Sequence, residues 1–88
     1  MKIKNGFLMR EIANNHIVVP TGERVIEFKG MMTLNETAGY IWKCLSEDIS
    51  YNELLSLVLK EYEIDEVTAK KDLDEFLETC REAGVLEE

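Results

Sequence analysis

Apolar and polar residues alternate with a period of two in the first third of the chain. Two runs there, Phe7 to Ile12 and His16 to Pro20, are apolar with polar interruptions, and the second is rich in β-branched residues, as strands usually are. Ala13-Asn14-Asn15 lies between the two runs and has the composition of a turn. The pattern therefore predicts a β-hairpin.

A third strand is expected after the turn-forming residues Thr21-Gly22-Glu23. In the segment from Val25 to Lys29, apolar side chains alternate with charged ones, so that one face would be buried and the other exposed. This alternation predicts a half-buried strand at the edge of a small sheet.

After Gly30 the period lengthens to about 3.6, and end signals mark three helices. Thr33-Leu34-Asn35-Glu36 fits a capping box for a first helix from about Asn35 to Ser46. Ser50-Tyr51-Asn52-Glu53 fits a second capping box, and the apolar stripe that follows it continues to Tyr62.

The third helix is expected to begin after Asp65, a good N-terminal cap, and to end before Gly84, where a left-handed residue is favoured. Val85 and Leu86 would then fold back onto the core. The element order βββααα, without an internal repeat, a linker or a low-complexity segment, predicts one compact α+β domain over residues 1–88.

The composition is that of a folded globular chain, with 45% hydrophobic and 32% charged residues. No apolar run approaches the length of a membrane span, and the first residues lack a signal-peptide pattern, so we expect a cytoplasmic protein without a membrane partner. Cys44 and Cys80 fall in apolar helical stripes and match no zinc pattern, so we expect both to be buried free thiols.

The net charge of −8 is unevenly distributed. Residues 1–45 carry six basic against four acidic side chains, whereas residues 46–88 carry four against fourteen. Nucleic acids are bound largely by Lys and Arg on phosphates, so the second half is a poor surface for them. The helix that would read bases in a winged helix-turn-helix protein offers a weak and partly repelling set: Asn52, Glu53, Ser56, Lys60 and Glu61. A DNA-binding regulator is therefore a minor alternative.

Catalytic chemistry has little support in the sequence. His16 is the lone histidine and reads as a turn or strand residue, while the carboxylates gather on helix surfaces where water keeps their pKa values ordinary. No glycine-rich phosphate loop or metal-ligand spacing occurs. Met9, Met31 and Met32 read as core filling rather than as a cofactor pocket. We expect a protein that is not an enzyme and that holds no metal or cofactor.

The exposed edge of the third strand has two explanations from the residues alone. Glu27 and Lys29 could simply shield the edge from pairing. Alternatively, an extended peptide could add to it by β-augmentation, in which main-chain hydrogen bonds give affinity and side-chain pockets give specificity. The pattern leaves both explanations open.

The segment from Met32 to Leu45 (MTLNETAGYIWKCL) closely resembles the pyrroloquinoline quinone biosynthesis protein D (PqqD-like) family, also called the RiPP recognition element. Further resemblance extends over nearly the whole chain: Ile17 to Gly22 is similar to the family's second strand and turn, Glu53-Leu54 to its second helix, and Asp72 to Leu86 to its last helix and tail. One departure is visible, because the family often reads Asn-Glu-Thr-Gly whereas Ala38 precedes Gly39 here.

The resemblance implies a winged helix-turn-helix-like fold, with a three-stranded antiparallel sheet followed by three helices. It also implies a non-catalytic chaperone that binds the leader of a ribosomally made precursor peptide by strand addition. The leader would be presented to a modifying enzyme, often a radical SAM enzyme that carries its own iron–sulfur clusters. The family's peptide lies between the third strand and the third helix. The positions implied here are Val25, Ile26, Glu27, Phe28, Lys29, Gly30 and Met31 on the strand and Val67, Lys70, Lys71 and Asp74 on the helix.

The four helical positions are spaced i, i+3, i+4 and i+7, so they share one face. Lys70 and Lys71 are the only basic pair of the acidic half, and we expect them either to meet acidic side chains of the leader or to be simply solvated. Val67 would take an apolar anchor. A further alternative is that the protein is a structural subunit that clamps the modifying enzyme. We expect a monomer or a weak dimer, because a free strand edge could pair with the same edge of a second copy.

Overall fold

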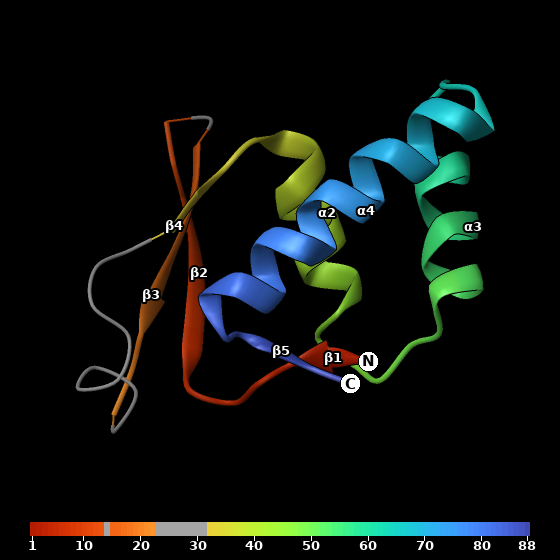
Figure 1. Cartoon of the computed structure of the whole chain (residues 1–88). Coiled ribbons are helices and arrows are strands. Elements are labelled where there is room, and N and C mark those ends of the chain that lie inside the picture. Colours follow the sequence, from red (N-terminus) through yellow and green to blue (C-terminus); the bar gives the residue numbers. More distant parts are fainter. Residues whose placement is uncertain (14, 23–31) are drawn as a thin grey trace.

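The computed structural model describes residues 1–13, 15–22 and 32–88. Within them, β2 (Phe7–Ile12), β3 (Asn15–Pro20) and β4 (Met32–Leu34) form an antiparallel sheet in the order β2-β3-β4 (Figure 1). β2 and β3 are the predicted hairpin, in which Phe7 pairs with Pro20 and Ile12 with Asn15. The predicted strand from Val25 to Lys29 lies outside the described residues.

β4 is a strand that the sequence pattern did not predict. It pairs with β3 so that His16 faces Leu34 and Val18 faces Met32. Because Leu34 is buried and extended, the first helix cannot begin at the predicted capping box, and Thr33 is not its cap. Asn35 caps the helix instead: its side-chain oxygen accepts a hydrogen bond of 2.8 Å from the Ala38 amide.

Three helices follow the sheet, α2 (Glu36–Cys44), α3 (Tyr51–Glu61) and α4 (Glu66–Ala83). The caps predicted for α3 and α4 are confirmed, whereas α2 ends at Cys44, two residues before the predicted Ser46. Ser50 accepts from the Glu53 amide at 3.2 Å and donates its hydroxyl to the Glu53 carboxylate at 2.9 Å. Asp65 accepts from the Thr68 amide at 2.7 Å, and Gly84 ends α4 with a φ of +75°.

The three helices meet in one apolar core against the inner face of β3. Among its fully buried side chains are Val18, Ile41, Leu45, Leu54, Val58, Leu73, Leu77, Cys80 and Val85. Burial raises the pKa of the Cys80 thiol to about 12, so the thiol stays protonated. The expectation for Cys44 was only partly right, because this second thiol is half-buried at the end of α2.

The two ends of the chain lie side by side (Figure 1). β1 (Lys2–Ile3) and β5 (Leu86–Glu87) pair antiparallel, a small sheet that the pattern did not predict. The Ile3 amide donates to the Leu45 carbonyl at 2.9 Å and the Lys4 amide to the Val85 carbonyl at 2.8 Å. Val85 and Leu86 are buried, as predicted, and the first residues help to hold them there. Among the described residues, no helix is long and apolar enough to cross a membrane.

Candidate functional site

The described sheet ends at β4, and a hollow opens where this edge strand runs into α2. We call it the α2–α4 hollow, and its volume is about 270 Å³. It is lined by Asn35, Thr37, Ala38 and Ile41 at the start of α2 and by Asp72, Glu75, Phe76 and Thr79 on α4. An extended segment that continued the sheet beyond β4 would therefore have a helix-lined hollow at its side.

The α2–α4 hollow combines an apolar base with an acidic rim. Ile41 and Phe76 are buried members of the core that reach its floor, whereas Asp72 and Glu75 are exposed. Neither carboxylate is in an ion pair within the part of the chain that the structure describes. Such a lining favours a side chain with an apolar stem and a cationic or hydrogen-donating end.

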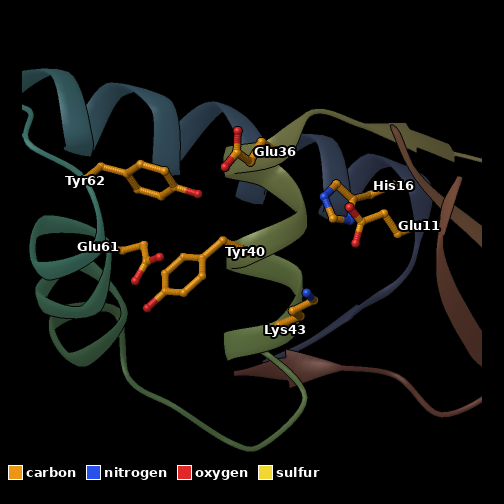
Figure 2. A pocket seen from close by; sticks show the side chains of 7 residues that line it. All are labelled: Glu11, His16, Glu36, Tyr40, Lys43, Glu61 and Tyr62. Atoms are coloured by element: carbon orange, nitrogen blue, oxygen red, sulfur yellow. The ribbon is translucent and has the colours of Figure 1, made fainter. Parts of the chain in front are cut away.

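A second hollow, of about 380 Å³, lies on the opposite flank of α2 and is shown in Figure 2. We call it the tyrosine pocket; it is lined by Glu11, His16, Glu36, Tyr40, Lys43, Glu61 and Tyr62. His16 is a strand residue, as predicted, but its burial was not foreseen: only 7% of it is exposed. α2 thus separates two hollows of different chemistry.

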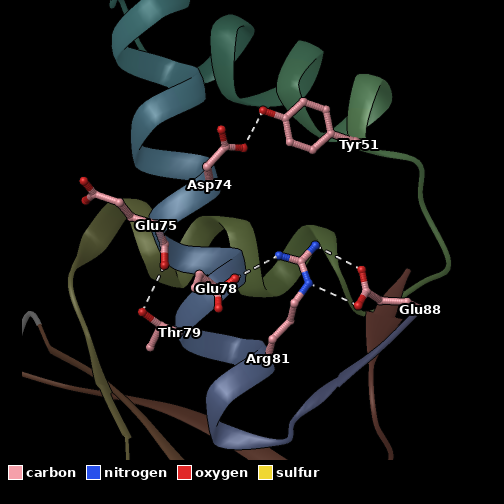
Figure 3. A network of polar contacts seen from close by, with 7 residues as sticks. All are labelled: Tyr51, Asp74, Glu75, Glu78, Thr79, Arg81 and Glu88. Carbon is pink, nitrogen blue, oxygen red and sulfur yellow. Dashed lines mark hydrogen bonds and ion pairs between the residues drawn. The ribbon is translucent and has the colours of Figure 1, made fainter.

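One of the predicted helical residues, Asp74, contacts α3. The Tyr51 hydroxyl on α3 donates to the Asp74 carboxylate at 2.7 Å (Figure 3), which raises the pKa of Tyr51 to about 12. Val67, Lys70 and Lys71 share a face of α4 with Asp74 by their spacing, and Val67 is 78% exposed. The structure therefore keeps these four together but does not bring them to the α2–α4 hollow. Their contact with a peptide stays a prediction.

The same flank of α4 continues toward the end of the chain. Arg81 is near Glu78, at 3.5 Å, and its guanidinium donates to both carboxylate oxygens of Glu88, at 3.0 and 3.1 Å (Figure 3). These groups are exposed, so the ion pairs contribute little to stability. They do hold the last residue against the helix.

Sequence reasoning missed the α4 residues that line the α2–α4 hollow. Asp72, Glu75, Phe76 and Thr79 have the same i, i+3, i+4, i+7 spacing as the predicted set but start at another residue. Phe76 is both a buried core residue and part of the lining of the hollow. The predicted strand residues, Val25 to Met31, lie outside the described residues.

No group of three or more His, Cys, Asp or Glu side chains among the described residues could hold a metal ion. Thr79 donates its hydroxyl to the Glu75 carbonyl at 3.0 Å, so one polar group beside the α2–α4 hollow is engaged within its own helix (Figure 3). The α2–α4 hollow offers contact surface: a strand edge beside it, the apolar side chains of Ile41 and Phe76, and two carboxylates without an ion pair among the described residues.

Comparison with known proteins agrees with the fold. The solved structure described as "TbiB1 in Complex with the TbiA(beta) Leader Peptide" is 23% identical, with a TM-score of 0.79 over 99% of this chain and 95% of that chain. The predicted fold is thereby confirmed. No curated protein matches the chain. Neither the family match nor the structural match supports the DNA-binding alternative. Residues 16–86 match the family described as Coenzyme PQQ synthesis protein D (PqqD), and the chain belongs to that family.

Proposed function

We propose that this protein binds the leader segment of a ribosomally made precursor peptide and presents it to a modifying enzyme, without catalysing a reaction itself. The observation that carries the proposal is the edge strand β4, which leads directly into the α2–α4 hollow in a member of the PqqD family. TbiB1, which shares the fold, is described in complex with a leader peptide. Strand addition at an edge with a neighbouring pocket is an established mode of peptide recognition.

In this proposal the leader pairs with the edge of β4 and with the predicted strand from Val25 to Met31, which precedes β4 in the sequence. One of its side chains enters the α2–α4 hollow, where the stem packs on Phe76 and the end meets Asp72 and Glu75. The residues Val67, Lys70, Lys71 and Asp74 add a second set of contacts. Because they lie on the other flank of α4, they bind only a leader that crosses the helix. The two sets can therefore be tested separately.

The mechanism is affinity and positioning rather than bond chemistry. A disordered leader becomes ordered on the protein, and its attached core segment then has a high effective concentration at the enzyme. We propose a radical SAM enzyme in the cytoplasm as the partner that performs the modification. The ordering cost opposes association, so the expected affinity is micromolar to nanomolar, roughly −8 to −12 kcal/mol.

The test is a titration of isotope-labelled protein with the leader of its precursor peptide. We expect amide shifts in residues 25–34 and from Asp72 to Thr79. Thr79→Arg should weaken binding about ten-fold, since a long cationic side chain would fill the rim of the α2–α4 hollow. Ser56→Arg, on an exposed position of α3, is the matched control and should leave the affinity unchanged.

The predicted lysines are tested in the same experiment. Replacing Lys70 and Lys71 together by Ala should weaken binding of an acidic leader, and the loss should shrink at high salt if the contacts are charge pairs at the surface. A cognate leader that shifts no amide in residues 25–34 and none from Asp72 to Thr79 would contradict the proposed function. A leader that responds to Thr79→Arg alone would assign binding to the α2–α4 hollow and not to the lysine face.

A further inference from the structure

The tyrosine pocket lies away from the proposed leader path, because the two hollows use different flanks of α2. Glu36, Tyr40 and Lys43, spaced i, i+4 and i+7, line the tyrosine pocket. The α2–α4 hollow is lined from the same helix by Thr37, Ala38 and Ile41. Both hollows can therefore be occupied together.

Two aromatic rings form one wall of the tyrosine pocket. Tyr40 and Tyr62 meet edge to face, with ring centroids 5.7 Å apart and planes at 87° (Figure 2). The Tyr40 hydroxyl donates to the Leu57 carbonyl at 3.4 Å, which fixes this ring against α3. Burial raises the pKa of Tyr40 to about 12 and also raises that of Tyr62, so both rings are neutral in the cell. Neutral phenol rings present π faces that attract cations.

The charges around the pocket are mostly negative and are unused. Glu11 comes from β2, Glu36 from α2 and Glu61 from the end of α3, and Lys43 is the one basic side chain of the lining. Within the described residues, none of these four takes part in an ion pair. Three free carboxylates beside two aromatic rings are complementary to a cationic group from another molecule.

The pocket also contains a buried polar side chain without a partner. His16 is more than nine-tenths buried, and its Nδ1 atom has no hydrogen bond within the described structure. Figure 2 shows the imidazole between β3 and α2, beside Glu11, which is its cross-strand neighbour. Buried polar groups in native proteins are usually hydrogen-bonded. His16 lines the inner wall of the tyrosine pocket, and its ring packs against Gly39 of α2, so the acceptors open to an occupant are the carboxylates of the lining.

We propose that the tyrosine pocket receives an arginine side chain of the modifying enzyme while the leader occupies the other flank of α2. A guanidinium is planar, stacks on aromatic rings and forms paired hydrogen bonds with carboxylates, which matches a lining of two tyrosines and three glutamates. The nature of the partner rests on the proposed function, whereas the chemistry of the occupant rests on the pocket alone.

The pocket is tested with N-acetyl-arginine amide, titrated into isotope-labelled protein. We expect a dissociation constant on the order of millimolar, with amide shifts at His16, Tyr40 and Glu61. N-acetyl-citrulline amide, which has the same shape without the charge, should cause no such shifts. The double variant Glu36→Gln/Glu61→Gln should bind the arginine probe at least about five-fold more weakly. Equal shifts from the citrulline probe, or unchanged binding by the variant, would overturn the proposal.

A control variant removes the same charge elsewhere. Glu82→Gln/Glu87→Gln changes two exposed carboxylates outside the pocket and should bind the arginine probe like the unaltered protein. If this control lost as much affinity for the arginine probe as Glu36→Gln/Glu61→Gln does, the effect would be one of net charge, and the assignment of a site would be overturned.

The partner is tested with the precursor and its enzyme. The Glu36→Gln/Glu61→Gln variant should keep its affinity for the leader within about two-fold. A higher concentration of this variant should nevertheless be needed for half-maximal modification of the precursor by the enzyme. Normal modification by the pocket variant would overturn the role in enzyme docking. If the leader does not bind the unaltered protein, the proposed function fails, and the arginine titration still decides whether the pocket takes a guanidinium.

Discussion

Gly39 lies so close to the imidazole of His16 that no larger residue fits. A Cβ atom at this position would be 2.6 Å from Cγ and 2.7 Å from Cδ2 of the ring. Ala38, one residue earlier, is half-buried and lines the α2–α4 hollow, so a side chain is tolerated there. The departure from the family's Asn-Glu-Thr-Gly pattern therefore changes the lining of the hollow and leaves the contact between α2 and β3 intact.

Gly39→Ala should destabilise the protein despite the better helix propensity of alanine. The propensity gain is about 1 kcal/mol, and the strain of forcing a methyl group into the imidazole is typically about 1 to 3 kcal/mol. We expect a net loss of about 1 kcal/mol in the free energy of unfolding, measured by urea denaturation. In the background of His16→Ala the same change should become neutral or stabilising. A Gly39→Ala protein more stable than the unaltered one would contradict the contact.

At the scale of elements, the strand β4 decides where α2 begins. The predicted capping box would make Thr33 the N-cap of this helix, whereas the structure has Asn35 in that role. Both cannot cap the same helix. Leu34 settles the choice, since its side chain is 5% exposed and its backbone pairs with β3. Tertiary burial keeps the backbone extended to Leu34 and leaves Asn35 as the cap.

The two residues should respond differently to truncation. Asn35→Ala removes the acceptor of the Ala38 amide and should cost about 1 kcal/mol of stability. Thr33→Ala removes an exposed side chain of β4 that caps nothing, and its cost should be a few tenths of a kcal/mol, about the effect of β propensity at an edge. Urea midpoints of the two variants give the comparison. A larger loss for Thr33→Ala would support the capping box instead.

Sequence periodicity was sufficient for elements whose signals are local. The hairpin, the caps of α3 and α4 and the left-handed Gly84 each depend on a few neighbouring residues, and all are present. Strand β4 and the β1–β5 pair were missed because three or two residues are too short to show a period. The face of α4 that borders the α2–α4 hollow was not predicted, because more than one face of this helix carries polar residues at helical spacing. Only the packing of α4 against α2 and α3 distinguishes these faces.

At the scale of the molecule, acidic side chains cover the helical half. Between residues 46 and 88 there are fourteen acidic and four basic residues, and Arg81 is the one basic residue of this half with an ion pair among the described side chains. Neighbouring carboxylates on α3 and α4 therefore repel one another more in the folded state than in the extended chain. This surplus also makes a cationic partner group favourable.

Added salt should stabilise the folded protein. Screening shortens the range of charge interactions from about 10 Å at 0.1 M to about 3 Å at 1 M, and here repulsion is the larger part. We expect the free energy of unfolding to rise by on the order of 1 kcal/mol over that range of NaCl. A Glu63→Gln/Glu75→Gln/Glu82→Gln variant should respond less. Unfolding curves at each salt concentration provide the measurement, and a stability that falls with salt would contradict the prediction.

The pairing of β1 with β5 brings residues 2–3 and residues 86–87 together. Lys2 faces Glu87 and Ile3 faces Leu86, so a few added residues would join the last residue to the first and make a hairpin of these strands. A circular permutant opened between β2 and β3 would keep every strand and helix. In the present chain, the pairing of β1 with β5 joins residues that are far apart in the sequence. In the permutant, only the added residues would separate the two strands, so we expect this pair to form early in folding rather than late.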